Sequence, residues 1–210
     1  MNESWSWLTW PNRISIARIL LVPVWVLCLL NMNDAWPGAR RAALGLYLVM
    51  AVSDALDGFL ARRWRQQSAI GAFLDPLADK LLTTCAVVIL AIEATAVPGA
   101  RLPSWVPVIA LGKDVLTVLG FALVYLATQR TLIRPRILGK VSTLVQSVMV
   151  AATLLTPDMP GGWRDVVEAL WAAASGAAVL AWLDYLRVGV RFVSEVHAAE
   201  EAGRGPSGSS

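Results

Sequence analysis

Histidine and cysteine are scarce in this sequence. Among 210 residues there is one histidine, His197, and there are two cysteines, Cys28 and Cys85, both inside apolar runs. No serine or cysteine stands beside a histidine, so the sequence offers no activated nucleophile for covalent catalysis. The two thiols are expected to be small buried apolar groups rather than a disulfide. His197, near the C-terminal tail, is expected to be solvated.

Charged residues are also few. They make up 16% of the chain, hydrophobic residues make up 57%, and the mean hydropathy is +0.59, a balance typical of membrane proteins. The start, MNESWSWLTWPNR, has an acidic residue and three tryptophans where a secretory signal has basic residues and an apolar run. No cleaved leader is therefore expected. The expected partners include membrane lipids and no nucleic acid.

Six segments are long and apolar enough to cross a bilayer core, which takes about 20 residues. Short polar breaks with Pro, Gly, Asn or Asp separate them and leave no room for a soluble domain. The sequence therefore predicts an all-α integral membrane protein with six transmembrane helices. The predicted spans are 14–31, 39–60, 71–97, 103–128, 137–156 and 166–190.

Basic residues are distributed unevenly between the two ends of these spans. With a cytoplasmic N-terminus, twelve fall on the cytoplasmic side and four on the other. The positive-inside rule then predicts an inner-membrane protein with both termini in the cytoplasm. Residues 1–12 are too short to span and are predicted to form an interfacial helix. Residues 1–197 are expected to form one domain, and 198–210 a disordered tail.

Four aspartates stand close together in this apolar chain. Asp54 and Asp57 lie near the end of the second predicted span, and Asp75 and Asp79 near the start of the third. Spacings of three and four residues place each pair on one helix face. Each carboxylate costs about 2.5–3.5 kcal/mol at mid-membrane, so the cluster needs positive charge nearby.

Two interpretations of the acidic cluster are open. In the first, it is a structural ion-pair network with Arg62, Arg63 and Lys80. In the second, it is a metal site, because a cage of oxygen ligands without thiolates suits Mg²⁺, Mn²⁺ or Ca²⁺. Two such ions about 4 Å apart hold phosphates during in-line displacement. We favour the second interpretation and expect two Mg²⁺ or Mn²⁺ ions, close to the cytoplasmic face.

The same residues carry a family resemblance. The pattern Asp54-x-x-Asp57-Gly58-x-x-Ala61-Arg62, then eight residues, then Gly71-x-x-x-Asp75-x-x-x-Asp79, resembles the signature of the CDP-alcohol phosphotransferases, integral membrane enzymes of phospholipid synthesis. All eight specified positions match. WPNRISIAR is similar to a second stretch of the family, with Ser15 in the usual threonine place. GKVSTLVQ is similar to a third, found in members that make phosphatidylglycerol phosphate or cardiolipin.

The resemblance implies transfer of a phosphatidyl group from CDP-diacylglycerol to an alcohol, with CMP leaving. It implies that Asp54, Asp57 and Asp75 hold the metals, and that Asp79 completes the cage and acts as general base. Arg62 is then expected to pair with the donor pyrophosphate. The rest of the expected donor site is Asp54, Gly58 and Ala61, the last two beneath the cytidine. The family also implies a homodimer.

Basic residues before the fifth predicted span are candidates for the acceptor site. Arg134, Arg136 and Lys140 would suit a phosphorylated alcohol, although ordinary positive-inside bias also explains them. Glycerol 3-phosphate is the favoured acceptor, giving phosphatidylglycerol phosphate. Phosphatidylglycerol, the acceptor of a cardiolipin synthase, also carries a phosphate, so charge does not separate the two. Inositol phosphate and serine remain open.

Two further charges, Lys113 and Asp114, lie inside the fourth predicted span, where isolated charges are costly. Because adjacent residues on a helix face different ways, each is expected to reach a separate partner. A hypothesis from another class is a divalent metal transporter. That function predicts ionisable residues spread through the membrane depth, whereas the four aspartates gather near one face.

Overall fold

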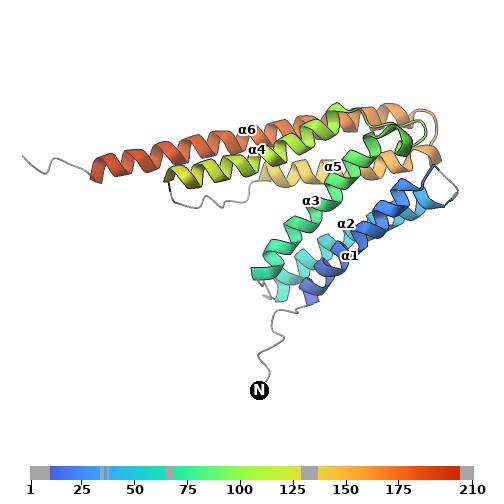
Figure 1. The fold of residues 1–210 in the computed structure, drawn as a ribbon, viewed down its shortest axis with the longest axis horizontal. Coiled ribbons are helices and arrows are strands. Elements are labelled where there is room, and N and C mark those ends of the chain that lie inside the picture. Colours follow the sequence, from blue (N-terminus) through green and yellow to red (C-terminus); the bar gives the residue numbers. More distant parts are fainter. Residues whose placement is uncertain (1–9, 34–35, 37, 65–68, 129–136, 204–210) are drawn as a thin grey trace, which may run out of the picture.

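The computed structural model describes residues 10–33, 36, 38–64, 69–128 and 137–203. For residues 10–12, 55–64, 69–77, 79, 127 and 197–203 it describes the backbone alone. The described chain is almost entirely helical (Figure 1). Its α-helices are α1 (Trp10–Leu30), α2 (Ala39–Trp64), α3 (Ala69–Ala91), α4 (Trp105–Thr128), α5 (Ile137–Leu155) and α6 (Trp163–Gly203), with 3₁₀ turns η1 (Glu93–Thr95) and η2 (Thr156–Asp158).

Each of the six predicted spans corresponds to one α-helix, but some predicted bounds are wrong. The third span does not continue to Val97, because α3 ends at Ala91 and Ile92 has an extended backbone with ψ of 134°. The hydroxyl of Thr95 donates a hydrogen bond of 2.6 Å to the carbonyl of Ile89 and so stabilises this helix end. At the other terminus α6 continues to Gly203, so residues 198–203, expected to be disordered, are helical.

The predicted N-terminal interfacial helix falls mostly outside the described residues. Residues 1–9 are not described, and residues 10–12 form the first turn of α1 rather than a separate element.

The helices form two groups that pack together at one end and diverge toward the other (Figure 1). The first group is α1–α3, in which α1 packs against both α2 and α3; the second is α4–α6, in which α6 packs against both α4 and α5. We call the end where the groups meet the closed end, and the other the open end. The end of α2 and the start of α3 lie at the open end, as does the start of α1.

The closed end has a continuous apolar core. Trp25 of α1 is fully buried; its indole nitrogen donates a 2.9 Å hydrogen bond to the carbonyl of Ala43 in α2, and its ring lies 5.6 Å from that of Tyr47. Trp171 of α6 donates a 3.1 Å hydrogen bond to the hydroxyl of Thr153 in α5. Because both indoles are buried with their N–H groups paired, they fix the packing of neighbouring helices.

Polar contacts also join the two groups at the closed end. Arg40, at the start of α2, donates a 2.7 Å hydrogen bond to the carbonyl of Leu154 and lies 2.8 Å from the carboxylate of Asp158. Arg41 contacts the same carboxylate at 3.2 Å. Two arginines on one aspartate fix α2 against the α5–η2 turn.

Within the described residues, four helices are long and apolar enough to cross a membrane: α1, α4, α5 and α6. Large apolar side chains are exposed along α4, among them Val108, Val118 and Leu123 at 66–68%. Such a surface is stable against lipid tails. In α2 and α3, the charges of the acidic motif interrupt the apolar sequence.

Candidate active site

The acidic motif occupies two joined helix ends. Asp54 and Asp57 lie in the last turns of α2, and Asp75 and Asp79 lie in the first turns of α3. Asp57 and Asp75 are each about two turns from the short connection between the helices, so the backbone holds them at the same level. The helix segments that carry the two pairs of aspartates therefore lie toward the open end of the first group.

The structure describes the side chain of only one of these four aspartates, Asp54. Those of Asp57, Asp75 and Asp79 lie outside the described part, as do those of Arg62 and Ala61, and Gly58 is described only as part of the α2 backbone. Arg134 and Arg136 fall in the undescribed segment 129–136. Among the side chains that are described, no group of three or more His, Cys, Asp or Glu could hold a metal ion.

A cavity of about 1070 Å³ lies between the two groups of helices. All six helices contribute to its lining, which is apolar except for a few polar and charged side chains. Of these, the charged ones are Arg18, Asp54, Lys80, Lys113, Asp114 and Lys140. A largely apolar cavity with convergent charged groups is the usual form of a binding site for a small ligand.

Asp54 is held in this cavity by Arg18 of α1. The Arg18 guanidinium forms an ion pair with the Asp54 carboxylate; Arg18 is 2% exposed, whereas the Asp54 side chain is 46% exposed. One carboxylate oxygen is thus engaged by a buried cation while the side chain stays accessible from the cavity. The pair fixes the orientation of Asp54 and joins α1 to α2.

The unequal burial of Arg18 and Asp54 leads to a prediction for stability. Asp54→Asn removes this counter-charge from a buried guanidinium, a loss that costs about 3–5 kcal/mol in a fully buried pair and less here, because the Asp54 side chain is 46% exposed. Arg18→Met leaves a carboxylate that water can reach, so it should cost less. The melting temperature in detergent should therefore fall by several degrees more for Asp54→Asn than for Arg18→Met. The scans are run in EDTA so that bound metal does not contribute.

The double variant provides the control for this prediction. Since it removes both charges, its melting temperature should lie close to that of Arg18→Met and above that of Asp54→Asn. Equal destabilisation by the two single variants would contradict the role assigned to burial.

A second charged cluster joins α3 to α4. Lys80 of α3 forms an ion pair with Asp114 of α4, and the ammonium of Lys113, which is 6% exposed, lies 3.1 Å from the same carboxylate. The expectation that Lys113 and Asp114 reach separate partners is therefore wrong. The lysine side chain is long and flexible enough to return to the carboxylate of the next residue.

Lys140, at the start of α5, is exposed and lines the cavity opposite the first group. At the preceding residue, Gly139, there is no space for a side chain. A Cβ atom built there would lie 2.7 Å from the hydroxyl oxygen of Tyr185 in α6, which is closer than a Cβ atom approaches another side chain. Gly139 thus allows Tyr185 to lie against α5 at the cavity wall.

Sequence reasoning missed several of these relations. Charges within apolar spans were a visible signal for Lys80 and Asp114, but the sequence did not indicate that they pair. The Arg18–Asp54 contact joins residues 36 positions apart, and no pattern in the sequence predicts it. Tyr185 lines the cavity without any local signal, because an isolated tyrosine in an apolar helix is ordinary.

Comparisons with known proteins agree with the resemblance in the motif. The family model of the CDP-alcohol phosphatidyltransferases matches residues 8–186. A CDP-diacylglycerol–glycerol-3-phosphate 3-phosphatidyltransferase from Bacillus subtilis is 32% identical over 82% of this chain and 91% of its own length. The protein of the same name from Escherichia coli K12 is 31% identical over 84% and 92%, respectively. A human cardiolipin synthase (CMP-forming) is 32% identical over 89% of this chain and 64% of its own length.

Proposed function

The chain belongs to the CDP-alcohol phosphatidyltransferase family, and we propose that it transfers a phosphatidyl group from CDP-diacylglycerol to glycerol 3-phosphate, releasing CMP. It is thus an enzyme of phospholipid biosynthesis. The observation that carries the proposal is the cavity between the helix groups. One wall has Asp54 of the acidic motif, and the opposite wall has Lys113 and Lys140. Such a site can hold a cation-bound pyrophosphate on one side and an acceptor phosphate on the other.

The acidic motif fits a site for divalent cations. Its four positions all supply carboxylate oxygens, the ligands that Mg²⁺ and Mn²⁺ prefer, and the described one, Asp54, is accessible from the cavity. We assign Asp54, Asp57, Asp75 and Asp79 as ligands of two such ions. When bound, these ions would neutralise the pyrophosphate oxygens of the donor.

The transfer itself requires a base and an aligned acceptor. Asp79 is assigned to take the proton from the acceptor hydroxyl, because a carboxylate among other carboxylates binds a proton more readily than an isolated one. The hydroxyl oxygen then forms a bond to the phosphorus that bears the diacylglycerol. The bond from that phosphorus to the CMP oxygen breaks, and CMP leaves with its electron pair. No covalent protein intermediate is required.

Other residues are assigned to substrate binding. Arg62 pairs with the donor pyrophosphate through its planar guanidinium. Gly58 and Ala61, with small or absent side chains, leave room for the cytidine beside Asp54. On the acceptor side, Lys140 of the cavity wall contacts the phosphate of glycerol 3-phosphate, together with Arg134 and Arg136.

The finer features of the architecture are part of the same proposal. Residues 1–197 form one domain, α1–α6 all span the inner membrane, and both termini and the active site face the cytoplasm. The distribution of basic residues and the position of the motif at one end of α2 and α3 support this orientation. The proposed working form is a homodimer.

A cardiolipin synthase is the second candidate, because the human relative of that name matches most of this chain. The two functions differ in the acceptor, which is phosphatidylglycerol in the second case. The test is CMP release by the purified protein from CDP-diacylglycerol and Mg²⁺ or Mn²⁺, with glycerol 3-phosphate, phosphatidylglycerol, inositol phosphate and serine supplied in turn. Release with glycerol 3-phosphate alone supports the proposal, and release with phosphatidylglycerol alone replaces it by the second candidate. Divalent ion flux through reconstituted vesicles without CMP release would reject both and favour a transporter.

A further inference from the structure

The residues assigned to the donor and those assigned to the acceptor lie in different groups of helices. The acidic motif lies in α2 and α3 of the first group, whereas Lys140, assigned to the acceptor phosphate, lies in α5 of the second. In-line transfer requires the acceptor oxygen and the donor phosphorus to approach within about 3–3.5 Å. The spacing between the groups at the cavity therefore determines whether bound donor and acceptor are aligned.

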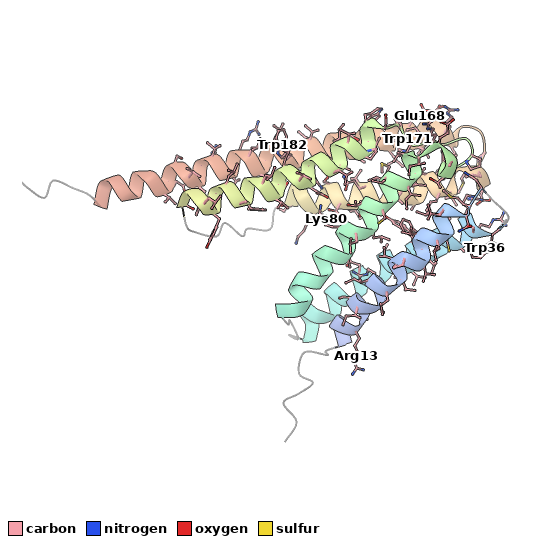
Figure 2. All side chains as sticks on the ribbon, viewed as in Figure 1. Arg13, Trp36, Lys80, Glu168, Trp171 and Trp182 are labelled. Atoms are coloured by element: carbon pink, nitrogen blue, oxygen red, sulfur yellow. The ribbon has the colours of Figure 1, made fainter. Side chains whose placement is uncertain are left out.

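Charged contacts join the two groups at two levels. At the closed end, Arg40 and Arg41 of α2 contact Asp158 at 2.8 and 3.2 Å. At the cavity, Lys80 of α3 pairs with Asp114 of α4. Figure 2 shows Lys80 along α3 at the level where the two groups diverge. Lys80 lies about 16 Å along α3 from Ala91, its closed end. A contact at that distance from the closed end limits the opening of the groups more strongly than one beside it.

Asp114 does not depend on Lys80 alone for its counter-charge. Asp114 already has a counter-charge in Lys113, whose ammonium lies 3.1 Å from its carboxylate. What Lys80 adds is a link between helices, and it is the residue that directly follows Asp79 in α3.

We infer that Lys80 and Asp114 are positioning residues, whose ion pair fixes α3 against α4 and thereby aligns the donor with the acceptor. This inference rests on the proposed transfer reaction. The contact acts between the two helix groups and requires no contact of either side chain with a substrate.

Lys80→Met tests the inference most directly, since it removes the link and leaves Asp114 paired with Lys113. The inter-group distance is measured by double electron–electron resonance in lipid nanodiscs. Spin labels are placed on Arg13→Cys in α1 and Glu195→Cys in α6, in a chain with Cys28→Ala and Cys85→Ala. Lys80→Met should broaden the distance distribution and shift it to longer values. Asp114→Asn, which breaks the contact from the other side, should do the same, and Lys80→Arg should preserve the original distribution.

The kinetic result separates alignment from binding. In Lys80→Met, kcat for CMP release should fall about tenfold, with the KM of each substrate changed less than twofold, because the substrate contacts remain while their alignment is lost. Glu168→Gln is the matched control. It breaks an ion pair of 2.8 Å with Arg164 inside α6, which joins no two helices, and it should change neither the distances nor kcat.

Two results would overturn the inference. One is an unchanged distance distribution in Lys80→Met, whatever its activity. The other is a changed distribution with an unchanged kcat, or with the loss confined to KM. Failure of the unmodified protein to release CMP would instead reject the proposed reaction, and the distance measurement would still decide whether Lys80 links the groups.

Discussion

Loss of CMP release is the expected result of replacing Asp75 by Asn. The substitution keeps the shape of the side chain and removes its negative charge, so a cation held by the acidic motif loses a ligand. Removing one preorganised electrostatic contact to a transition state typically costs 10²–10³ in kcat. We expect a fall of about 10³-fold or more, because Asp75 would act on the cation that neutralises the reacting phosphate. The measurement is initial-rate CMP release with saturating CDP-diacylglycerol and glycerol 3-phosphate.

Asp165→Asn is the matched control for this experiment. Asp165 is an exposed carboxylate in the first turn of α6, at the closed end of the molecule. Its replacement makes the same chemical change far from the cavity and should leave the rate unchanged. An Asp75→Asn protein that elutes as a monodisperse species and still turns over at more than a tenth of the normal rate would remove Asp75 from the proposed site.

Removal of divalent cations should have an effect of similar size. In the proposed site, four carboxylates act on a pyrophosphate, and these negative charges repel one another strongly unless cations lie between them. Incubation with EDTA followed by dialysis should therefore reduce CMP release to background. Addition of Mg²⁺ or Mn²⁺ should restore it, and a titration of each ion gives the preference between them.

The control is EDTA that has been saturated with Mg²⁺ beforehand, which should leave activity intact. Full activity of the dialysed protein, with metal content below one ion per chain by elemental analysis, would contradict a metal-dependent reaction. In that case EDTA should also inhibit the Asp54→Asn variant no more than it inhibits the unmodified protein.

The local architecture was predictable from the sequence because each helix is a local structure. Runs of apolar residues about 20 long, separated by Pro, Gly and Asp, are enough to identify all six helices and to place most of their ends within a few residues. The errors are at helix ends. The end of α3 depends on the Thr95 side chain, and the extension of α6 to Gly203 shows that polar composition near a terminus does not exclude a helix.

The arrangement of charges in the cavity was only partly predictable. The spacing of Asp54, Asp57, Asp75 and Asp79 identified the motif, because it is a local pattern on two consecutive helices. The pairing of Arg18 with Asp54 and of Lys80 with Asp114 depends on how helices pack, over separations of 36 and 34 residues. No periodicity in a single sequence encodes those choices.

The length of α6 has a consequence beyond the site. Its 41 residues extend about 60 Å at 1.5 Å per residue, twice the roughly 30 Å of a hydrocarbon layer. Even at a tilt of about 40°, near the upper limit for such helices, about 20 Å of its length lies outside the hydrocarbon layer. The C-terminal end of α6 is therefore a helical extension beyond the membrane-spanning part. Energy transfer between a fluorophore attached there and labelled lipid headgroups would measure its height above the membrane surface. That height would show how the whole molecule is oriented in the membrane.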